Sequence, residues 1–511
     1  MAISVVTISA ISLFLYDWQG QWSKLTNRPI NKMSNAKPIG ELKTLVSLVD
    51  RTDFDEAVYP ANEANTRFQP IIKHYTNYIQ ETTVWPFSGR PDWGQRVTFS
   101  VPWPWEADFL HWIALRLEPM SWLSNLVCAQ VQLGVYVPLA PDQMWIWASS
   151  LGSAAIQLAE MEVDGVILES FTGDWLTTWN QTHHTVTDGI AWDDAVYGVQ
   201  ANPDYKHHVP SEDGLVYCYL PFWFSKFSNT AFPLLSCSGP NRVRFHITTR
   251  PFADLVRMVS MPKECNQTPL GTSFEYRDYS FPFRQFATYT IGSAVPSFAA
   301  ADMICGISQL DKPYRDPYLV KPHELLMNPV VQTVFAEPLK YVTNTPAGNS
   351  ITIKLPLTDA NGPLKQILFF LRRNDAPTKY AEWDNFGAVL GPDVDPVFNP
   401  QRPLLHKAQL MVGTAVFADE DENWWRSQAN VMMPGGIRGS GNYIYGFNFA
   451  ELPSSFSPTG SVNASRVDLW LTLTVLPPGG ATDSEWSVTV FFITQNFMRF
   501  ENGLANLLFM D

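Results

Sequence analysis

Charged residues are scarce in this chain of 511 residues: they make up 16% of it, against 46% hydrophobic residues. So few charges among so many apolar side chains exclude an intrinsically disordered protein. Basic residues are also in the minority, with 35 Lys and Arg against 49 Asp and Glu, for a formal net charge of −14. A protein that packages nucleic acid needs cations to displace phosphate counterions, so this balance argues against direct DNA or RNA binding.

Cysteine is rare as well, with five residues scattered at positions 128, 218, 237, 265 and 305. No CxxC or Cys/His spacing of a zinc site occurs. This sparse, odd set fits a reducing compartment and predicts buried thiols.

The nearly uncharged segment 3–16 is too short to span a bilayer, which takes roughly 20 residues. It also lacks the positive n-region and the cleavage site of a secretory signal. We interpret it as a buried strand or a contact arm, with a membrane-associated anchor as the alternative. Met33 is a candidate internal start.

Long helix-forming runs are absent, whereas aromatic residues reach 14% and prolines number 39. Proline interrupts helices and aromatic side chains favour pleated surfaces, so the chain is predicted to be mostly β. Apolar and polar residues alternate with the period of a half-buried strand in several segments of the first half. These segments are 96–101, 109–117, 159–163 and 242–247, with Asp164-Gly165 as a hairpin turn.

The second half shows the same kind of pattern in different residues. Strands are predicted at 351–357, 364–371, 409–417, 467–475 and 486–494, the last two as partners joined by a turn at 477–480. Two β-dense halves predict two sandwiches or jelly rolls. The predicted limits are an N-terminal arm at 1–60, a first jelly roll at 61–252, a Pro- and Gly-rich connection at 253–296 and a second jelly roll at 297–511.

Seven short motifs occur in one order along the chain. Among them are Asp108-Phe109-Leu110-His111, Gly173-Asp174-Trp175-Leu176 and Pro322-His323-Glu324-Leu325-Leu326. The full set lies at 40–46, 66–78, 108–111, 163–179, 322–326, 460–468 and 496–505, and the stretch 215–249 adds a strand, an aromatic turn and an alternating strand. This series resembles the major capsid proteins of nucleocytoplasmic large DNA viruses, from about residue 40 to residue 508.

The resemblance implies an all-β fold of two consecutive eight-stranded jelly rolls, with short helices in the loops and an N-terminal arm. It also implies a structural, non-enzymatic role without cofactors, in homotrimeric pseudo-hexagonal capsomers that tile an icosahedral shell. The implied partners are other copies, neighbouring capsomers, minor capsid and penton proteins, and for the arm an internal membrane or minor proteins. The expected location is the virion, assembled in the host cytoplasm. The leader 1–32 and the acidic block 419–423 depart from the family pattern.

No coherent catalytic, cofactor or metal site emerges from the residue spacing. His323-Glu324 begins like a zinc protease motif, but the second ligand position holds Met327. Glu160 and Glu162 share one strand face, where a solvated outer surface is the expected role rather than glycoside hydrolysis. The paired histidines 183–184 and 207–208 are expected in exposed loops. The alternative is a metal site that they form with the aspartates at 193, 194 and 204.

Two further features leave alternatives open. The tryptophans at 103, 105, 145 and 147 could fill gaps between subunits or pack in the core. Sequons at Asn180, Asn266 and Asn463 matter only if the chain meets a glycosyltransferase. The alternative function is a carbohydrate-binding or carbohydrate-active double β-sandwich, because abundant Trp and Tyr can stack on sugar rings.

Overall fold

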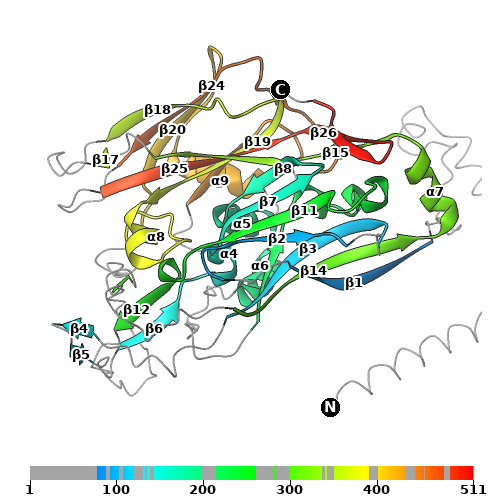
Figure 1. Ribbon diagram of the computed structural model, residues 1–511. Coiled ribbons are helices and arrows are strands. Elements are labelled where there is room, and N and C mark those ends of the chain that lie inside the picture. Colours follow the sequence, from blue (N-terminus) through cyan, green and yellow to red (C-terminus); the bar gives the residue numbers. More distant parts are fainter. Residues whose placement is uncertain are drawn as a thin grey trace, which may run out of the picture. The chain divides into compact units, whose positions relative to one another are not determined.

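The fold is given by a computed structural model, shown in Figure 1. It describes residues 77–509 except 88–91, 103–106, 120–129, 133–134, 138–142, 197–214, 261–280, 283–297, 337–339, 342–349, 391–400, 433–442, 454 and 477–483. All of the described residues belong to one compact unit, 76–511. The predicted arm at 1–60 lies outside the described residues.

Eight strands of the first half form two facing antiparallel sheets. In chain order they are β1 (Tyr78–Pro86), β2 (Arg96–Ser100), β3 (Phe109–Pro119), β7 (Ile156–Val163), β8 (Val166–Phe171), β9 (Val216–Leu220), β11 (Val243–Thr249) and β14 (Phe298–Leu310). One sheet has the order β1-β14-β3-β9 and the other β2-β11-β7-β8. Numbered one to eight, the strands therefore follow the orders 1-8-3-6 and 2-7-4-5.

The second half repeats this order without repeating the sequence. Its strands are β16 (Val330–Phe335), β18 (Ile351–Pro356), β19 (Pro363–Arg373), β20 (Leu405–Val412), β21 (Ala415–Asp421), β22 (Ile444–Asn448), β24 (Leu469–Val475) and β25 (Ser484–Thr494). They form the sheets β16-β25-β19-β22 and β18-β24-β20-β21, again 1-8-3-6 and 2-7-4-5. The predicted double jelly roll is confirmed.

Shorter elements decorate the two jelly rolls. The helices are α4 (Leu151–Ala155), α5 (Gly173–His183), α6 (Val186–Ala195), α7 (Lys312–Val320), α8 (Asp375–Tyr380) and α9 (Glu422–Met432), with 3-10 turns η1 (Trp223–Ser225), η2 (Ser228–Thr230), η3 (Leu234–Ser236) and η4 (Phe252–Asp254). The remaining strands are β4 (Gln130–Gln132), β5 (Val135–Val137), β6 (Gln143–Trp147), β10 (Phe232–Pro233), β12 (Val256–Ser260), β13 (Phe281–Pro282), β15 (His323–Met327), β17 (Lys340–Tyr341), β23 (Val462–Asn463), β26 (Asn496–Glu501) and β27 (Leu504–Leu507).

Alternating segments form strands where they were predicted. In β24 every second side chain is buried between the sheets, and β7 follows the same pattern. Asp164 and Gly165 both adopt positive φ angles, of 52° and 85°, as the tight turn between β7 and β8 requires.

The structure corrects three placements. Strand β14 was assigned to the second jelly roll, but it pairs with β1 and β3 as the eighth strand of the first, which Figure 1 shows. The segment 409–417 is not one strand: β20 and β21 meet at a turn where Gly413 has a φ of 60°. The expected partnership of β24 with β25 is wrong, because these two strands, the seventh and eighth of the second jelly roll, lie in opposite sheets.

The predicted connection at 253–296 contains ordered strands of its own. Within its described part, β12 pairs with β6 and β13 in a small sheet. The loop between the seventh and eighth strands of the first jelly roll therefore has a folded base.

Candidate functional site: the junction between the jelly rolls

One sheet of the second jelly roll is buried on both faces. On β25, Val490 and Phe492 point into the core of the second jelly roll, while Phe491 and Ile493 belong to the core of the first. On β19, Phe369 likewise belongs to the core of the second jelly roll, and its neighbours Leu368 and Phe370 belong to the core of the first. The middle of β19 is accordingly apolar at every position, because neither side meets water.

Helix α5 of the first jelly roll packs on this shared sheet. The Trp175 ring lies 5.1 Å from the Phe491 ring, and the Trp175 side chain is fully buried. The helix begins at Gly173, where a Cβ atom would lie 2.0 Å from the carbonyl oxygen of Ser153. Glycine is therefore required for α5 to approach α4, and the Gly-Asp-Trp motif belongs to the junction.

A buried ion pair crosses the junction from α5 to β19. The Arg372 guanidinium donates two hydrogen bonds to the Asp174 carboxylate, at 2.7 and 3.0 Å, and one to the Trp383 carbonyl at 3.0 Å. Burial opposes ionisation of Asp174, but Arg372 and, beyond it, Arg250 outweigh burial and lower the pKa of this carboxyl. Because the two hydrogen bonds are parallel, they fix the orientation of the Arg372 guanidinium relative to the Asp174 carboxylate as well as the distance between them.

The Trp383 ring extends this contact to η4. The Arg250 guanidinium lies 3.6 Å from the ring centre, and the indole N–H donates to the Asp254 carbonyl at 3.0 Å. Burial lowers the pKa of Arg250 to about 10. Cation–π contact and hydrogen bond together hold the segment after α8 against the first jelly roll.

A second buried pair fastens β16 to the first jelly roll. The Glu169 carboxylate accepts hydrogen bonds from the backbone N–H groups of Trp223, at 2.7 Å, and Val330, at 3.1 Å. The Lys226 ammonium lies 4.0 Å from Glu169 and donates to the Asn328 carbonyl at 3.0 Å. Burial raises the pKa of Glu169 and lowers that of Lys226, and each partner opposes the shift of the other.

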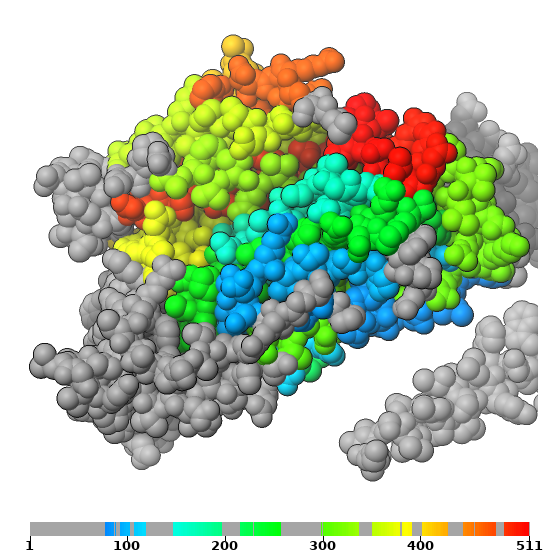
Figure 2. Space-filling model, viewed as in Figure 1, coloured from blue at the N-terminus to red at the C-terminus, as the bar shows by residue number. Residues whose placement is uncertain are grey.

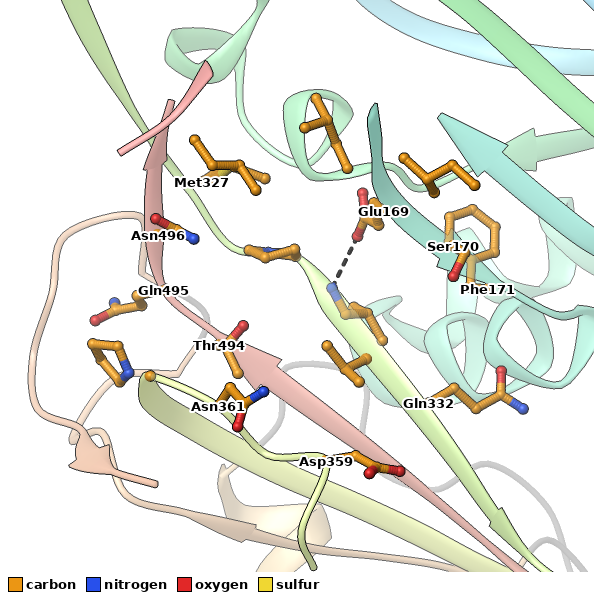
Figure 3. Close-up of a pocket in the computed structure, with 18 of the residues that line it drawn as sticks. Glu169, Ser170, Phe171, Met327, Gln332, Asp359, Asn361, Thr494, Gln495 and Asn496 are labelled. Atoms are coloured by element: carbon orange, nitrogen blue, oxygen red, sulfur yellow. Dashed lines mark hydrogen bonds between the residues drawn. The ribbon is translucent and has the colours of Figure 1, made fainter. Parts of the chain in front are cut away.

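An open cleft of about 880 Å³ lies beside the Glu169–Val330 bond, between β8 and β16. Figure 3 shows Glu169 at its inner wall and the side chains of Thr494, Gln495 and Asn496 along the opposite side. Gln332 bridges the two strands at one end, because its amide oxygen accepts from the Thr172 backbone N–H at 3.3 Å and hydroxyl at 2.9 Å. Among the described residues that line the cleft there is no histidine or cysteine, and the Glu169 carboxylate already accepts two backbone hydrogen bonds.

The C-terminal hairpin of β26 and β27 clasps the first jelly roll. The Ala505 N–H donates to Asp164 at 3.0 Å, and Arg242 binds the same carboxylate at 2.6 Å. The Ser238 N–H donates to the Gly503 carbonyl at 3.0 Å. In Figure 2 the red C-terminal segment lies against the cyan and green surface of the first jelly roll.

Replacing Gly503 by Ala is expected to loosen this clasp by about 1–3 kcal/mol. Gly503 has a φ of +77°, and a Cβ atom would lie 2.0 Å from the Ser238 hydroxyl. The matched control is Gly413→Ala, since Gly413 also has a positive φ but nothing within 4 Å of its Cβ position. Denaturant midpoints check the difference: equal losses in the two variants would contradict a steric clasp, and adding Ser238→Gly should restore part of the Gly503→Ala loss.

The carboxylates predicted on the outer face of β7 are engaged in ion pairs rather than fully solvated. Glu160 pairs with Arg96 at 2.7 Å and Glu162 pairs with Arg244 at 3.3 Å, and the two glutamate side chains are 13% and 17% exposed. The His323 ring stacks on Phe500 with centroids 5.0 Å apart, and Met327 is buried in the core.

The histidine pair predicted in an exposed loop is instead at the end of α5. The His183 ring stacks on Trp179 at 3.7 Å, and His184 bonds Asn180 at 3.0 Å. Asn180 is buried and donates to Asp193 at 2.9 Å, which places this sequon away from the surface, whereas Asn463 is exposed. Residues 204, 207, 208 and 266 lie outside the described residues.

Two composition-based predictions gain partial answers. Trp147 packs in the core against Trp93, with ring centroids 5.7 Å apart, while 103 and 105 lie outside the described residues, as does the side chain of 145. Cys218, Cys237 and Cys305 are buried, as predicted, and burial raises their pKa values.

Within the described part of the chain no group of three or more His, Cys, Asp or Glu side chains is placed to hold a metal ion. In the same residues no helix is both long and apolar enough to cross a bilayer.

Sequence reasoning missed Asp174, Arg372, Glu169 and Lys226. The available signal was a charged residue inside or beside an otherwise apolar run, as in Phe369-Phe370-Leu371-Arg372 of β19. Buried charges in such positions require partners, but sequence alone does not name the partner.

Residues 66–272 match the family described as the major capsid protein N-terminus. The chain is 22% identical over 461 residues to the major capsid protein of Pyramimonas orientalis virus, covering 88% of this chain and 95% of that protein. Among solved structures, a quasi-atomic model of the PBCV-1 virus capsid matches with a TM-score of 0.62 at 16% identity, covering 87% of this chain and 100% of that one. The Faustovirus major capsid protein matches with a TM-score of 0.61 at 12% identity, covering 91% and 97%.

These comparisons agree with the arrangement of the strands. The sequence match to the family model covers most of the first jelly roll, and the structural matches cover both jelly rolls together. The expected resemblance to the major capsid proteins of nucleocytoplasmic large DNA viruses is therefore confirmed, in sequence and in the double jelly-roll fold.

Proposed function

We propose that this chain is the structural major capsid subunit of an icosahedral virus, acting by geometry and burial rather than by catalysis. The single observation that supports this best is the repeated 1-8-3-6 and 2-7-4-5 strand order in a chain that aligns with almost the whole length of a viral major capsid protein. The matching chain of the PBCV-1 virus capsid has the same fold.

The junction supplies the mechanical property that such a subunit needs. Two jelly rolls that share a doubly buried sheet and two buried ion pairs behave as one block. Three copies in a closed ring would present six jelly rolls, a pseudo-hexagonal unit suited to tiling a facet, and closed rings avoid open-ended fibres. Interfaces in permanent assemblies of this kind commonly bury above roughly 2,000 Å².

The remaining assignments follow from this role. The partners are copies of the chain, neighbouring capsomers, minor capsid and penton proteins, with the N-terminal arm contacting an internal membrane or minor proteins. The location is the virion, after assembly in the host cytoplasm. For the domain limits we propose that the first jelly roll runs through β14 and that the second begins with β15.

The alternative, a carbohydrate-binding double sandwich, requires exposed flat rings on which sugars can stack. In the described residues the exposed large apolar side chains include Tyr and Phe but no Trp, and tryptophans such as Trp175, Trp223 and Trp425 are buried. Burial of the largest rings favours packing over sugar binding.

Size-exclusion chromatography with light scattering tests the proposal directly. The purified chain is expected to elute as a trimer, three times 57.7 kDa, and to appear in electron micrographs as hexagonal blocks. A well-behaved monomer at micromolar concentration would contradict the proposal, and binding on a glycan array would favour the alternative.

A further inference from the structure

Three basic side chains lie together at the junction. His183 ends α5 and Lys226 lies between η1 and η2, both in the first jelly roll, whereas Lys365 lies on β19 of the second. The Lys365 side chain is almost fully buried, and its ammonium donates to the Ser455 carbonyl at 2.7 Å. The group therefore spans both jelly rolls.

The Trp179 ring links two of these side chains. His183 stacks on it with an interplanar angle of 14°, and the Lys226 ammonium lies 5.3 Å from its centre. The His183 Nδ1 atom is 2.8 Å from the Thr182 hydroxyl. A protonated His183 would thus place a further cation beside Lys226 on the same aromatic ring.

The charges that face His183 are mostly of one sign. Lys226, His184 and Lys365 act on its ring, while the carboxylate of this region, Glu169, is engaged by Lys226 and two backbone N–H groups. Asp174, at the other end of α5, is held by Arg372. An added positive charge on His183 would therefore lack an available carboxylate among these groups.

Burial, followed by these neighbouring cations, lowers the pKa of His183 well below its ordinary value of 6.5. Burial and Lys226 lower the pKa of Lys365 to about 8. The hydrogen bond between His183 and the Trp179 backbone opposes the first shift without cancelling it. Both shifts have the sign expected for groups withdrawn from water beside other cations.

We propose that His183 makes the junction an acid-sensitive joint, in which uptake of a proton by its ring in mildly acidic solution loosens α5 from the shared sheet and Lys226 from the segment that leads into β16, while each jelly roll keeps its own fold. The proposal concerns the joint alone and does not rest on the capsid role.

The direction and size of the effect follow from proton linkage. In the closed joint the ring stays neutral, and in the open joint it meets water and titrates at its ordinary 6.5. Below that pH the open state binds more protons, so stability of the closed joint falls as pH falls. At pH 5.5 the opening equilibrium is expected to rise about 10-fold over its value at neutral pH.

Hydrogen exchange on the full chain at pH 7.5 and 5.5, corrected for intrinsic exchange rates, measures this opening. Amides of α5 and β16 are expected to lose about 10-fold in protection at pH 5.5. Amides of β24, which lies between β18 and β20 inside the second jelly roll, should keep theirs. Unchanged protection of α5 and β16 in the acidic sample would overturn the proposal.

Variants identify the responsible group. His183→Phe keeps a flat ring on Trp179 but cannot take up a proton, so its α5 protection should not respond to pH. His406→Gln, at an exposed position of β20, is the matched control and should respond like the parent chain. If His183→Phe fails to fold, His183→Gln tests the same point, because an amide side chain takes up no proton in this pH range.

The same acid response in His183→Phe or His183→Gln as in the parent would exclude the histidine. Because the readout is local exchange in the purified chain, it is separable from the proposed function. If the exchange experiment shows no acid response, the trimer and the hexagonal blocks expected of a capsid subunit are not contradicted. If the chain is a monomer, the exchange result still tests the joint.

Discussion

Replacing Arg372 by Met is expected to lower the free energy of unfolding by about 3–5 kcal/mol. The substitution leaves the Asp174 carboxylate, only 7% exposed, without the guanidinium that neutralises it. It also removes the hydrogen bond to the Trp383 carbonyl across the junction. Equilibrium denaturation of the purified variant measures the loss.

Two further variants separate this effect from general damage. Arg499→Met removes an exposed pair with Glu501, in which the side chains are 44% and 45% exposed, and should cost at most about 1 kcal/mol. Combining Arg372→Met with Asp174→Leu should restore much of the stability, because no charge is then left buried alone. If Arg372→Met alone lost no more stability than the Arg499→Met control, the Asp174–Arg372 pair would not hold the junction.

Phe491→Ala is expected to cost about 3–5 kcal/mol and to loosen the junction selectively. The Phe491 ring fills the space between Trp175, at 5.1 Å, and Phe370, at 6.0 Å. Its removal leaves a cavity between α5 and the shared sheet. Denaturation gives the total loss, and hydrogen exchange of α5 gives its location.

The neighbouring residue provides a matched control. Phe492 is also fully buried on β25 but faces the core of the second jelly roll. Phe492→Ala should cost a similar free energy while α5 keeps its protection and β24 loses it. If both variants loosened α5 equally, the two faces of the sheet would not belong to separate cores.

Strands with one solvent-exposed face could be predicted from the sequence. In such strands apolar residues that face the core alternate with polar residues that face the solvent. That condition holds for β24 and β7, which lie where alternation placed them. Strand pairing could not be read in the same way. The β24 and β25 segments follow one another in sequence but join different sheets, because the chain crosses from one sheet to the other between the seventh and eighth strands.

The junction was less predictable because it depends on contacts between residues that lie far apart in sequence. Asp174 belongs to a recognisable motif, but nothing near it in sequence points to Arg372, 198 residues away. The position of β14 shows the same limitation: its role as the eighth strand depends on β1 and β3, more than 180 residues earlier. His183 was misjudged because a polar neighbourhood resembles a loop, whereas the helix end that it occupies is packed against Trp179.

The doubly buried sheet has a consequence for the alignment of its strands. In an ordinary sheet a shift by one residue drives polar side chains into the core, and that penalty selects the alignment. Around Phe369 such a shift would only exchange one apolar core for another, so hydrophobicity cannot select the alignment of β19. The charged residues that flank its apolar run can select it. Lys365 donates to the Ser455 carbonyl at one end. At the other end Arg372 binds Asp174 and Arg373 donates to the Ala388 carbonyl. The polar contacts at its two ends therefore fix the register of β19, which the apolar residues in its middle cannot do.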